Sequence, residues 1–289
     1  MLTTYSPTGK NDPLTFALIL PIIIVGAVAA VAYAFLSRWI PLIYLDAVLV
    51  IVFGYALYQC VQVGLTIGKC RNPATGAMIG LFVGIIATGT AHYVSYLNVL
   101  RSMPPGTNLA FGEYLKIKAD VGWTIGKGGS GIPIKGIFVW LIWAIEAVIV
   151  IGAAIMGGLA AASKPFCESC NVWANLTTHQ FAIPGIQPAS VERISNASDL
   201  EAILMPPLNE IGPGPNSLAY RVRSCPTCKQ VAFLDLALTT TTVDKKGKTE
   251  SSTKPVGKLL VLTPAEGEAI GQLQADVEQV ISAAVPTSV

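Results

Sequence analysis

The stretch that decides the fold is KGIFVWLIWAIEAVIVIGAAIMGGLAAASKPFCESC, residues 135–170. Its apolar part, residues 136–162, carries a single ionisable side chain, Glu146. Crossing about 30 Å of hydrocarbon takes roughly 20 helical residues, so this run is long enough to span a bilayer. It leads directly into a Cys-x-x-Cys pair, Cys167 and Cys170. We therefore expect a membrane part before this junction and a water-soluble part after it.

The composition agrees with this division of the chain. Of 289 residues, 52% are hydrophobic and only 12% are charged, whereas soluble proteins carry about a quarter charged residues. Between residues 11 and 100 the acidic, basic and histidine residues are Asp12, Arg38, Asp46, Lys69, Arg71 and His92. The net charge of +2 and the lack of a basic cluster argue against a nucleic-acid partner. We predict two domains, residues 1–162 and 163–289.

Three further apolar runs reach spanning length, at residues 14–36, 40–65 and 77–99. The fold expected for the first domain is an α-helical membrane bundle of four transmembrane helices, with the first two joined by a tight loop at residues 37–39. The segment 102–135 is too polar to span. Within it, FGEYLKIKADVGW (residues 111–123) has the spacing of a short amphipathic helix that lies at the membrane interface.

The second domain has the pattern of an α+β fold. Alternating residues predict strands at 217–223 and 230–243, and residues 256–262 are expected to pair back as a hairpin. Ser198-Asp199-Leu200-Glu201 and Thr263-Pro264-Ala265-Glu266 are both capping boxes. They predict a short helix after Ser198 and a longer one from Pro264 to about residue 283.

The strongest chemical signal is a pair of Cys-x-x-Cys motifs, Cys167 with Cys170 and Cys225 with Cys228. Tetrahedral zinc takes four ligands, and a two-residue loop presents two thiolates at the right separation. We predict a closed structural zinc site with no open position for catalysis, with redox dithiols or disulfides as the alternatives. The order of knuckle, strand and hairpin resembles the zinc-ribbon fold over residues 165–175 and 217–262.

Three ionisable residues, Asp46, His92 and Glu146, fall inside predicted spans at depths that could let them meet. Charges there cost about 2.5–3.5 kcal/mol or more, so they must pair, be neutralised or face water. One interpretation is a proton or ion pathway, or an acid and base pair acting on a membrane substrate. The other is a hydrogen-bonded clamp that fixes the helices in register.

The sidedness signals conflict. Four spans place both termini on one side, and the Lys and Arg residues near the span ends weakly favour the other side as cytoplasmic. The four cysteines favour cytoplasmic termini, because metal-binding thiolates persist in a reducing compartment. We give the cysteines more weight and predict both termini in the cytoplasm.

Three stretches carry a resemblance: RWIPLIYLDAVLVIVFGYALYQCVQVGLTIGKCRN (residues 38–72), IPIKGIFVWLIWAIE (132–146) and KPFCESCNVW (164–173). They resemble uncharacterised bacterial multi-span membrane proteins with a cysteine-containing C-terminal tail. The resemblance implies a bacterial inner-membrane location and the architecture above, and it assigns no catalytic residue.

No enzyme motif is recognised in the chain. The function expected is that of a structural or adaptor subunit in a larger membrane assembly, with the lipid bilayer and other protein subunits as partners in a homo- or hetero-oligomer. One alternative is proton- or ion-coupled transport through Asp46, His92 and Glu146. The second is a membrane enzyme that acts on a lipidic substrate.

Overall fold

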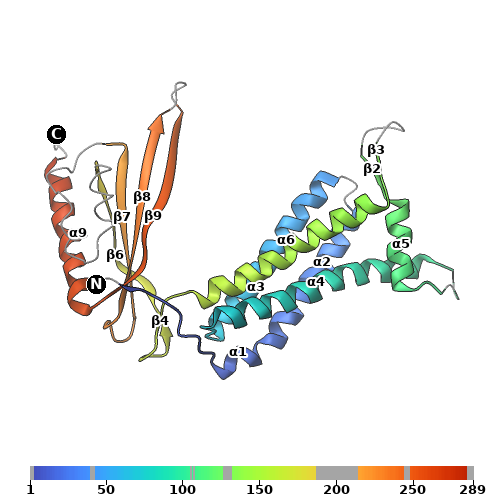
Figure 1. Ribbon diagram of the computed structural model, residues 1–289, viewed down its shortest axis with the longest axis horizontal. Coiled ribbons are helices and arrows are strands. Elements are labelled where there is room, and N and C mark those ends of the chain that lie inside the picture. The colour runs from blue at the N-terminus through green and yellow to red at the C-terminus, as the bar shows by residue number, and fades with distance from the viewer. Residues whose placement is uncertain are drawn as a thin grey trace. The chain divides into compact units, whose positions relative to one another are not determined.

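The computed structural model describes residues 3–39, 43–104, 106, 108–125, 132–186, 214–243 and 248–284. The chain forms two compact units, a helical one and one built on a sheet (Figure 1). The helical unit is Pro7–Ser163. The sheet unit is Lys164–Val289 together with Met1–Ser6.

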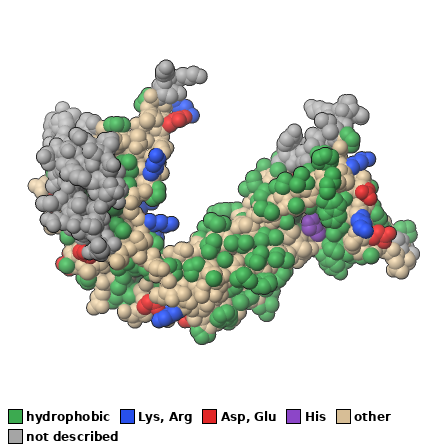
Figure 2. Space-filling model, viewed as in Figure 1, with side chains coloured by type: hydrophobic (Ala, Val, Ile, Leu, Met, Phe, Trp, Pro, Cys, Tyr) green, Lys and Arg blue, Asp and Glu red, His purple; other side chains and the backbone are tan. Residues whose placement is uncertain are grey.

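Four stretches of the helical unit are long and apolar enough to cross a membrane, as the sequence predicts. They are Pro13–Trp39, Leu45–Ile67, Pro73–Ser102 and Ile137–Ala162. The helices themselves are α1 (Pro13–Ala17), α2 (Ile19–Trp39), α3 (Ile43–Ile67), α4 (Pro73–Ser102) and α6 (Ile137–Ala162). Large apolar side chains cover the outer faces of these helices (Figure 2), as expected for surfaces that meet lipid tails.

Two details of the first span differ from expectation. The span is interrupted at Leu18, between α1 and α2. Pro21 explains the break, because a proline ring clashes with the carbonyl four residues earlier, here that of Ala17, where α1 ends. Residues 37–39 were expected to form the loop to the second span, but they continue α2 to Trp39.

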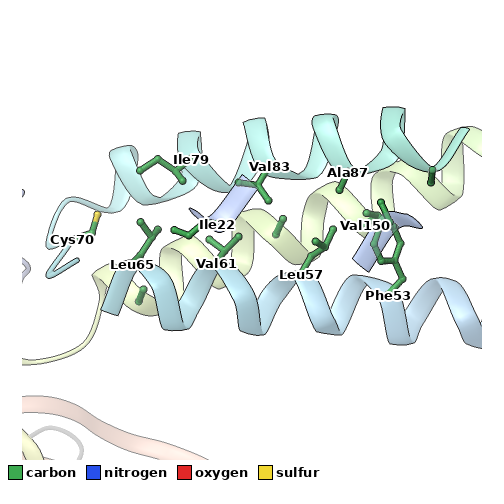
Figure 3. Close-up of a cluster of buried hydrophobic side chains, with 14 of the residues drawn as sticks. Ile22, Phe53, Leu57, Val61, Leu65, Cys70, Ile79, Val83, Ala87 and Val150 are labelled. Atoms are coloured by element: carbon green, nitrogen blue, oxygen red, sulfur yellow. The ribbon is translucent and has the colours of Figure 1, made fainter. Parts of the chain in front are cut away.

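Around the bundle the spans follow the order α2, α3, α6, α4, since α2 and α6 each pack on both α3 and α4. Small residues let α4 and α6 approach closely: a Cβ at Gly76 would lie 2.6 Å from the carbonyl oxygen of Gly158. A cluster of buried apolar side chains fills one part of the bundle (Figure 3). They include Ile22, Leu57, Val61, Leu65, Ile79 and Val83.

The segment between α4 and α6 contains the predicted helix, α5 (Phe111–Val121), followed by a small hairpin of β2 (Trp123–Ile125) and β3 (Ile132–Ile134). Aromatic contacts hold α5 against α4. The ring of Tyr96 lies 5.5 Å from those of both Phe111 and Tyr114, and its hydroxyl donates to the carbonyl of Leu109 at 2.7 Å.

The sheet unit contains a five-stranded antiparallel sheet in the order β1-β9-β8-β7-β6. Its strands are β1 (Thr3–Thr4), β6 (Asn175–Pro184), β7 (Asn216–Ser224), β8 (Ala232–Val243) and β9 (Thr249–Leu262). A separate short hairpin, β4 (Phe166–Cys167) with β5 (Val172–Trp173), precedes β6. The predicted strands and hairpin correspond to β7, β8 and β9. Strands β1 and β6 were not predicted.

One helix, α9 (Pro264–Ala284), packs on this sheet. Its residues Ile270, Leu273 and Val277 recur at helical spacing and join buried residues of the strands in one core. The predicted capping box is formed, because Glu266 Oε2 accepts from the backbone N–H of Thr263 at 2.6 Å. The other predicted helix, after Ser198, lies outside the described residues.

Candidate metal centre and polar cavity

The four cysteines of the two Cys-x-x-Cys motifs come together in the sheet unit. The sulfur atoms of Cys167, Cys170, Cys225 and Cys228 all lie within 4.8 Å of one another. The Sγ atoms of Cys167 and Cys228 are 3.8 Å apart. In a tetrahedral site with metal–sulfur bonds of about 2.3 Å, sulfur atoms also lie about 3.8 Å apart. The four sulfurs are therefore close enough together to hold one metal ion.

Two similar turns build the cluster. The first joins β4 to β5 and the second joins β7 to β8. In each, the residue after the second cysteine has a left-handed backbone, with φ of 55° at Asn171 and 56° at Lys229. Each turn also points backbone N–H groups at its first sulfur: Cys167 accepts from Cys170, and Cys225 accepts from Thr227 and Cys228. These N–H groups stabilise negative charge on the sulfurs.

The same contacts shift the pKa values of two of the thiols in opposite directions. Burial raises the pKa of Cys225, but the N–H groups of Cys228 and Thr227 and the neighbouring thiols outweigh it and lower that pKa to about 6. The adjacent Cys228 thiol raises the pKa of Cys170 to about 12. A bound metal needs all four sulfurs as thiolates, so it must displace protons from the others. Four protein ligands complete a tetrahedral shell and leave no open position for catalysis.

The three intramembrane residues predicted as a cluster line one cavity of about 1060 Å³ in the helical unit. Asp46 comes from α3, His92 from α4 and Glu146 from α6. Asp46 Oδ1 accepts a hydrogen bond of 2.7 Å from the hydroxyl of Ser37 on α2. The His92 ring packs edge-on against Trp143 at 5.3 Å. The cavity thus gathers all three residues within one half of the bundle.

Besides Arg38 of α2, sequence reasoning missed a second basic residue in the cavity wall, Lys118 of α5. Its Nζ lies 5.6 Å from the ring centre of Trp143 and 5.8 Å from that of Tyr114. Burial lowers the pKa of Lys118, while the carboxylates of Glu146 and Asp46 act to raise it. From the sequence alone, Lys116 and Lys118 are equivalent. Which of them faces the cavity depends on how α5 packs on α4 and α6, and the local sequence does not show this.

Comparisons of this chain with protein-family models, with curated proteins and with solved structures found no match, so no family identifies it.

Proposed function

We propose that this protein is a membrane-anchored adaptor, in which a four-span bundle holds a zinc-stapled domain that binds other protein subunits. The observation that carries the proposal is the meeting of four thiol sulfurs within 4.8 Å, supplied by two matching turns. A closed four-thiolate shell stabilises a fold and offers no catalytic position. A stable domain that is joined to a membrane anchor can bind a partner protein at the membrane.

We assign zinc to this ligand set. Tetrahedral sites of four thiolates hold zinc or iron, and a site with backbone N–H groups directed at its sulfurs suits either ion. The resemblance to a zinc ribbon at the two turns supports zinc. In that interpretation β6 is part of an insertion between the two halves of the ribbon.

The exposed surface of the sheet unit offers a place for a partner. The end of β8 beyond Thr240 extends past the start of β7, and it pairs with Thr249–Ser251 of β9 as a two-stranded ribbon. Its cross-strand contacts include small hydroxyl side chains, such as Thr241 with Ser251 at 3.3 Å. Exposed ribbons of this kind accept an added strand from another chain. This ribbon is our candidate contact surface.

Strand β1 supports the predicted topology. Thr3 and Thr4 pair with Val261 and Leu260 of β9. Two segments of one sheet must lie on the same side of a membrane, which requires an even number of crossings between them. Four spans meet that requirement. Because metal-binding thiolates need a reducing compartment, we place both termini in the cytoplasm, at a bacterial inner membrane.

The decisive experiment combines elemental analysis with partner recovery, using the full-length protein purified in detergent. We expect one zinc per chain in the wild type and none in Cys225→Ser. The matched control is Cys60→Ser, which changes a free cysteine of α3. Partner recovery should fall with zinc in the first variant and persist in the second. Iron in place of zinc would refute the metal assignment, and unchanged recovery without metal would refute the adaptor role.

Ion-coupled transport is the second candidate, because Asp46, His92 and Glu146 line one cavity. In the described helices, however, the other half of the bundle is filled by buried side chains such as Leu57, Leu65 and Val83. A transport cycle would have to open that layer. Proton or cation flux into proteoliposomes that disappears in Glu146→Gln would establish this function, and absence of flux from the wild type would exclude it.

A further inference from the structure

The cavity of the helical unit has a balanced set of charges. Two acidic residues, Asp46 and Glu146, and two basic residues, Arg38 and Lys118, line it. They come from four different helices, so only the folded bundle brings them together. Charge of both signs in one cavity complements a ligand that also carries both signs.

Most of the remaining wall is apolar. Side chains from α3 and α6, among them Val50, Phe53, Ile145 and Val150, line the cavity beside the charged groups. Its volume of about 1060 Å³ lies at the upper end of the range for ligand sites. The cavity is also partly open to the outside of the bundle. A cavity that combines charged groups with apolar walls suits an amphiphilic ligand. The polar part of the ligand binds the charged groups, and its apolar chains extend through the opening of the cavity.

Two polar groups in the wall lack a partner among the described residues. Both the hydroxyl of Thr88 and the indole N–H of Trp123 are buried and without a hydrogen bond. Both residues line the cavity. Buried polar groups in proteins are nearly always satisfied, so orphans at a cavity point to a ligand or ordered water that bonds them. The indole can only donate, which calls for an acceptor oxygen on the ligand.

We propose that this cavity binds the headgroup of a zwitterionic phospholipid that bears a primary ammonium group. The ammonium lies between Asp46 and Glu146, and the phosphate accepts from Lys118 and Arg38. The glycerol and ester oxygens accept from Thr88 and Trp123, while the acyl chains follow the apolar wall out of the bundle. This ligand site goes beyond the adaptor role and does not depend on the metal.

The headgroup chemistry disfavours glycerol and choline headgroups. An anionic headgroup without an amine draws Lys118 and Arg38 to its phosphate and brings no cation of its own to the two carboxylates, which is costly in a largely apolar surrounding. A quaternary choline headgroup carries the charge but has no N–H to donate to carboxylate oxygens. Only a primary amine supplies both the charge and the donors. The cavity should therefore select ethanolamine headgroups over choline and glycerol headgroups.

Native mass spectrometry can test this selectivity directly. The full-length protein is reconstituted in nanodiscs that contain equal amounts of phosphatidylethanolamine, phosphatidylcholine and phosphatidylglycerol, then released into mild detergent. We expect one phosphatidylethanolamine to remain per chain, enriched about tenfold or more over the other two, as charge-assisted hydrogen bonds would give. Equal retention of the three lipids, preference for phosphatidylglycerol, or no retained lipid would each overturn the proposal.

Matched variants then locate the site. Lys118→Gln removes a cation from the cavity wall, whereas Lys116→Gln removes an exposed cation of the same helix that does not line it. We expect lipid retention to fall about threefold in the first variant and to stay unchanged in the second. Asp46→Asn should reduce the preference for ethanolamine over choline, with Asp120→Asn of α5 as its exposed control. Equal effects in the variants of either pair would assign the bound lipid to the outer surface of the bundle and overturn the proposal.

A folding check keeps the variant results interpretable. The helical circular dichroism and the thermal midpoint of each variant should match the wild type. The wild-type selectivity decides the proposal even where a variant fails to fold. Zinc content, measured in the same samples, reports on the adaptor proposal separately.

Discussion

The close packing of α4 on α6 predicts that Gly80→Ala lowers the free energy of unfolding. A Cβ at this position would lie 2.7 Å from the carbonyl carbon of Ala154 and 2.8 Å from Cα of Ile155, and it would also contact the carbonyl oxygen of Ala154. These are backbone atoms, so no side-chain rotation can relieve the clash. Because carbon atoms prefer separations of about 3.5–4.0 Å, the two helices must separate by roughly 1 Å at this point.

The destabilisation from this clash is partly offset by the higher helix propensity of alanine. Overpacking of this kind destabilises by about 1–3 kcal/mol, while alanine is favoured over glycine in a helix by up to about 1 kcal/mol. We therefore expect Gly80→Ala to lose about 1–2 kcal/mol of unfolding free energy. Gly89 of the same helix is the matched control, since a Cβ there has nothing within 4 Å. Gly89→Ala should be neutral or gain up to about 1 kcal/mol.

The assay is reversible unfolding of the full-length protein in mixed detergent micelles, followed by helical circular dichroism. The informative quantity is the difference between the two variants, because both make the same chemical change in the same helix. We expect Gly80→Ala to be the less stable by about 1–3 kcal/mol, which is the overpacking cost, because the helix-propensity gain is common to both variants. Equal stability of the two variants would refute the close approach of α4 and α6.

Three further predictions concern the sheet unit. Asp235→Ala should cost about 1–3 kcal/mol in urea unfolding, because this carboxylate accepts from the backbone N–H of Leu259 at 2.9 Å and pairs with an arginine of β7. The control Glu250→Ala breaks an exposed ion pair and should cost less than about 1 kcal/mol. Equal losses in the two variants would contradict the difference in burial between the two carboxylates. Thr263→Ala should remove about 1 kcal/mol by opening the capping box, read as faster amide exchange in the first turn of α9; unchanged exchange would show that the cap is dispensable. Removal of the metal with a chelator should lower the unfolding midpoint of the sheet unit and leave that of the helical unit unchanged, and a midpoint insensitive to chelation would argue against a structural metal.

The features that could be predicted from the sequence are those with a local signal. Spanning helices are visible because about 20 apolar residues must follow one another. The meeting of the four cysteines was accessible because each Cys-x-x-Cys turn fixes half of the site by itself. The capping box at Thr263 and Glu266 likewise depends on four adjacent residues.

The features that were missed depend on distant contacts. The sequence of β6 shows no strand pattern, because its residues gain their strand conformation from pairing with β7. The paired residues are 30 or more positions apart in the chain. Strand β1 is only two residues long and has no pattern to detect. Lys118 belongs to a helix whose amphipathic spacing was recognised, but its role depends on which side of that helix covers the cavity. The break at Leu18 could have been read from Pro21, whose clash with residue 17 is a local effect.

The pairing of β1 with β9 has a consequence for how the protein is made. Thr3 and Thr4 leave the ribosome early, while Val261 and Leu260 follow only after all four apolar helices have been synthesised. The first strand must therefore wait, unpaired, until the rest of the sheet exists. Assembly of the sheet is completed after membrane insertion, so a bulky fusion placed directly before Thr3 would obstruct its last step.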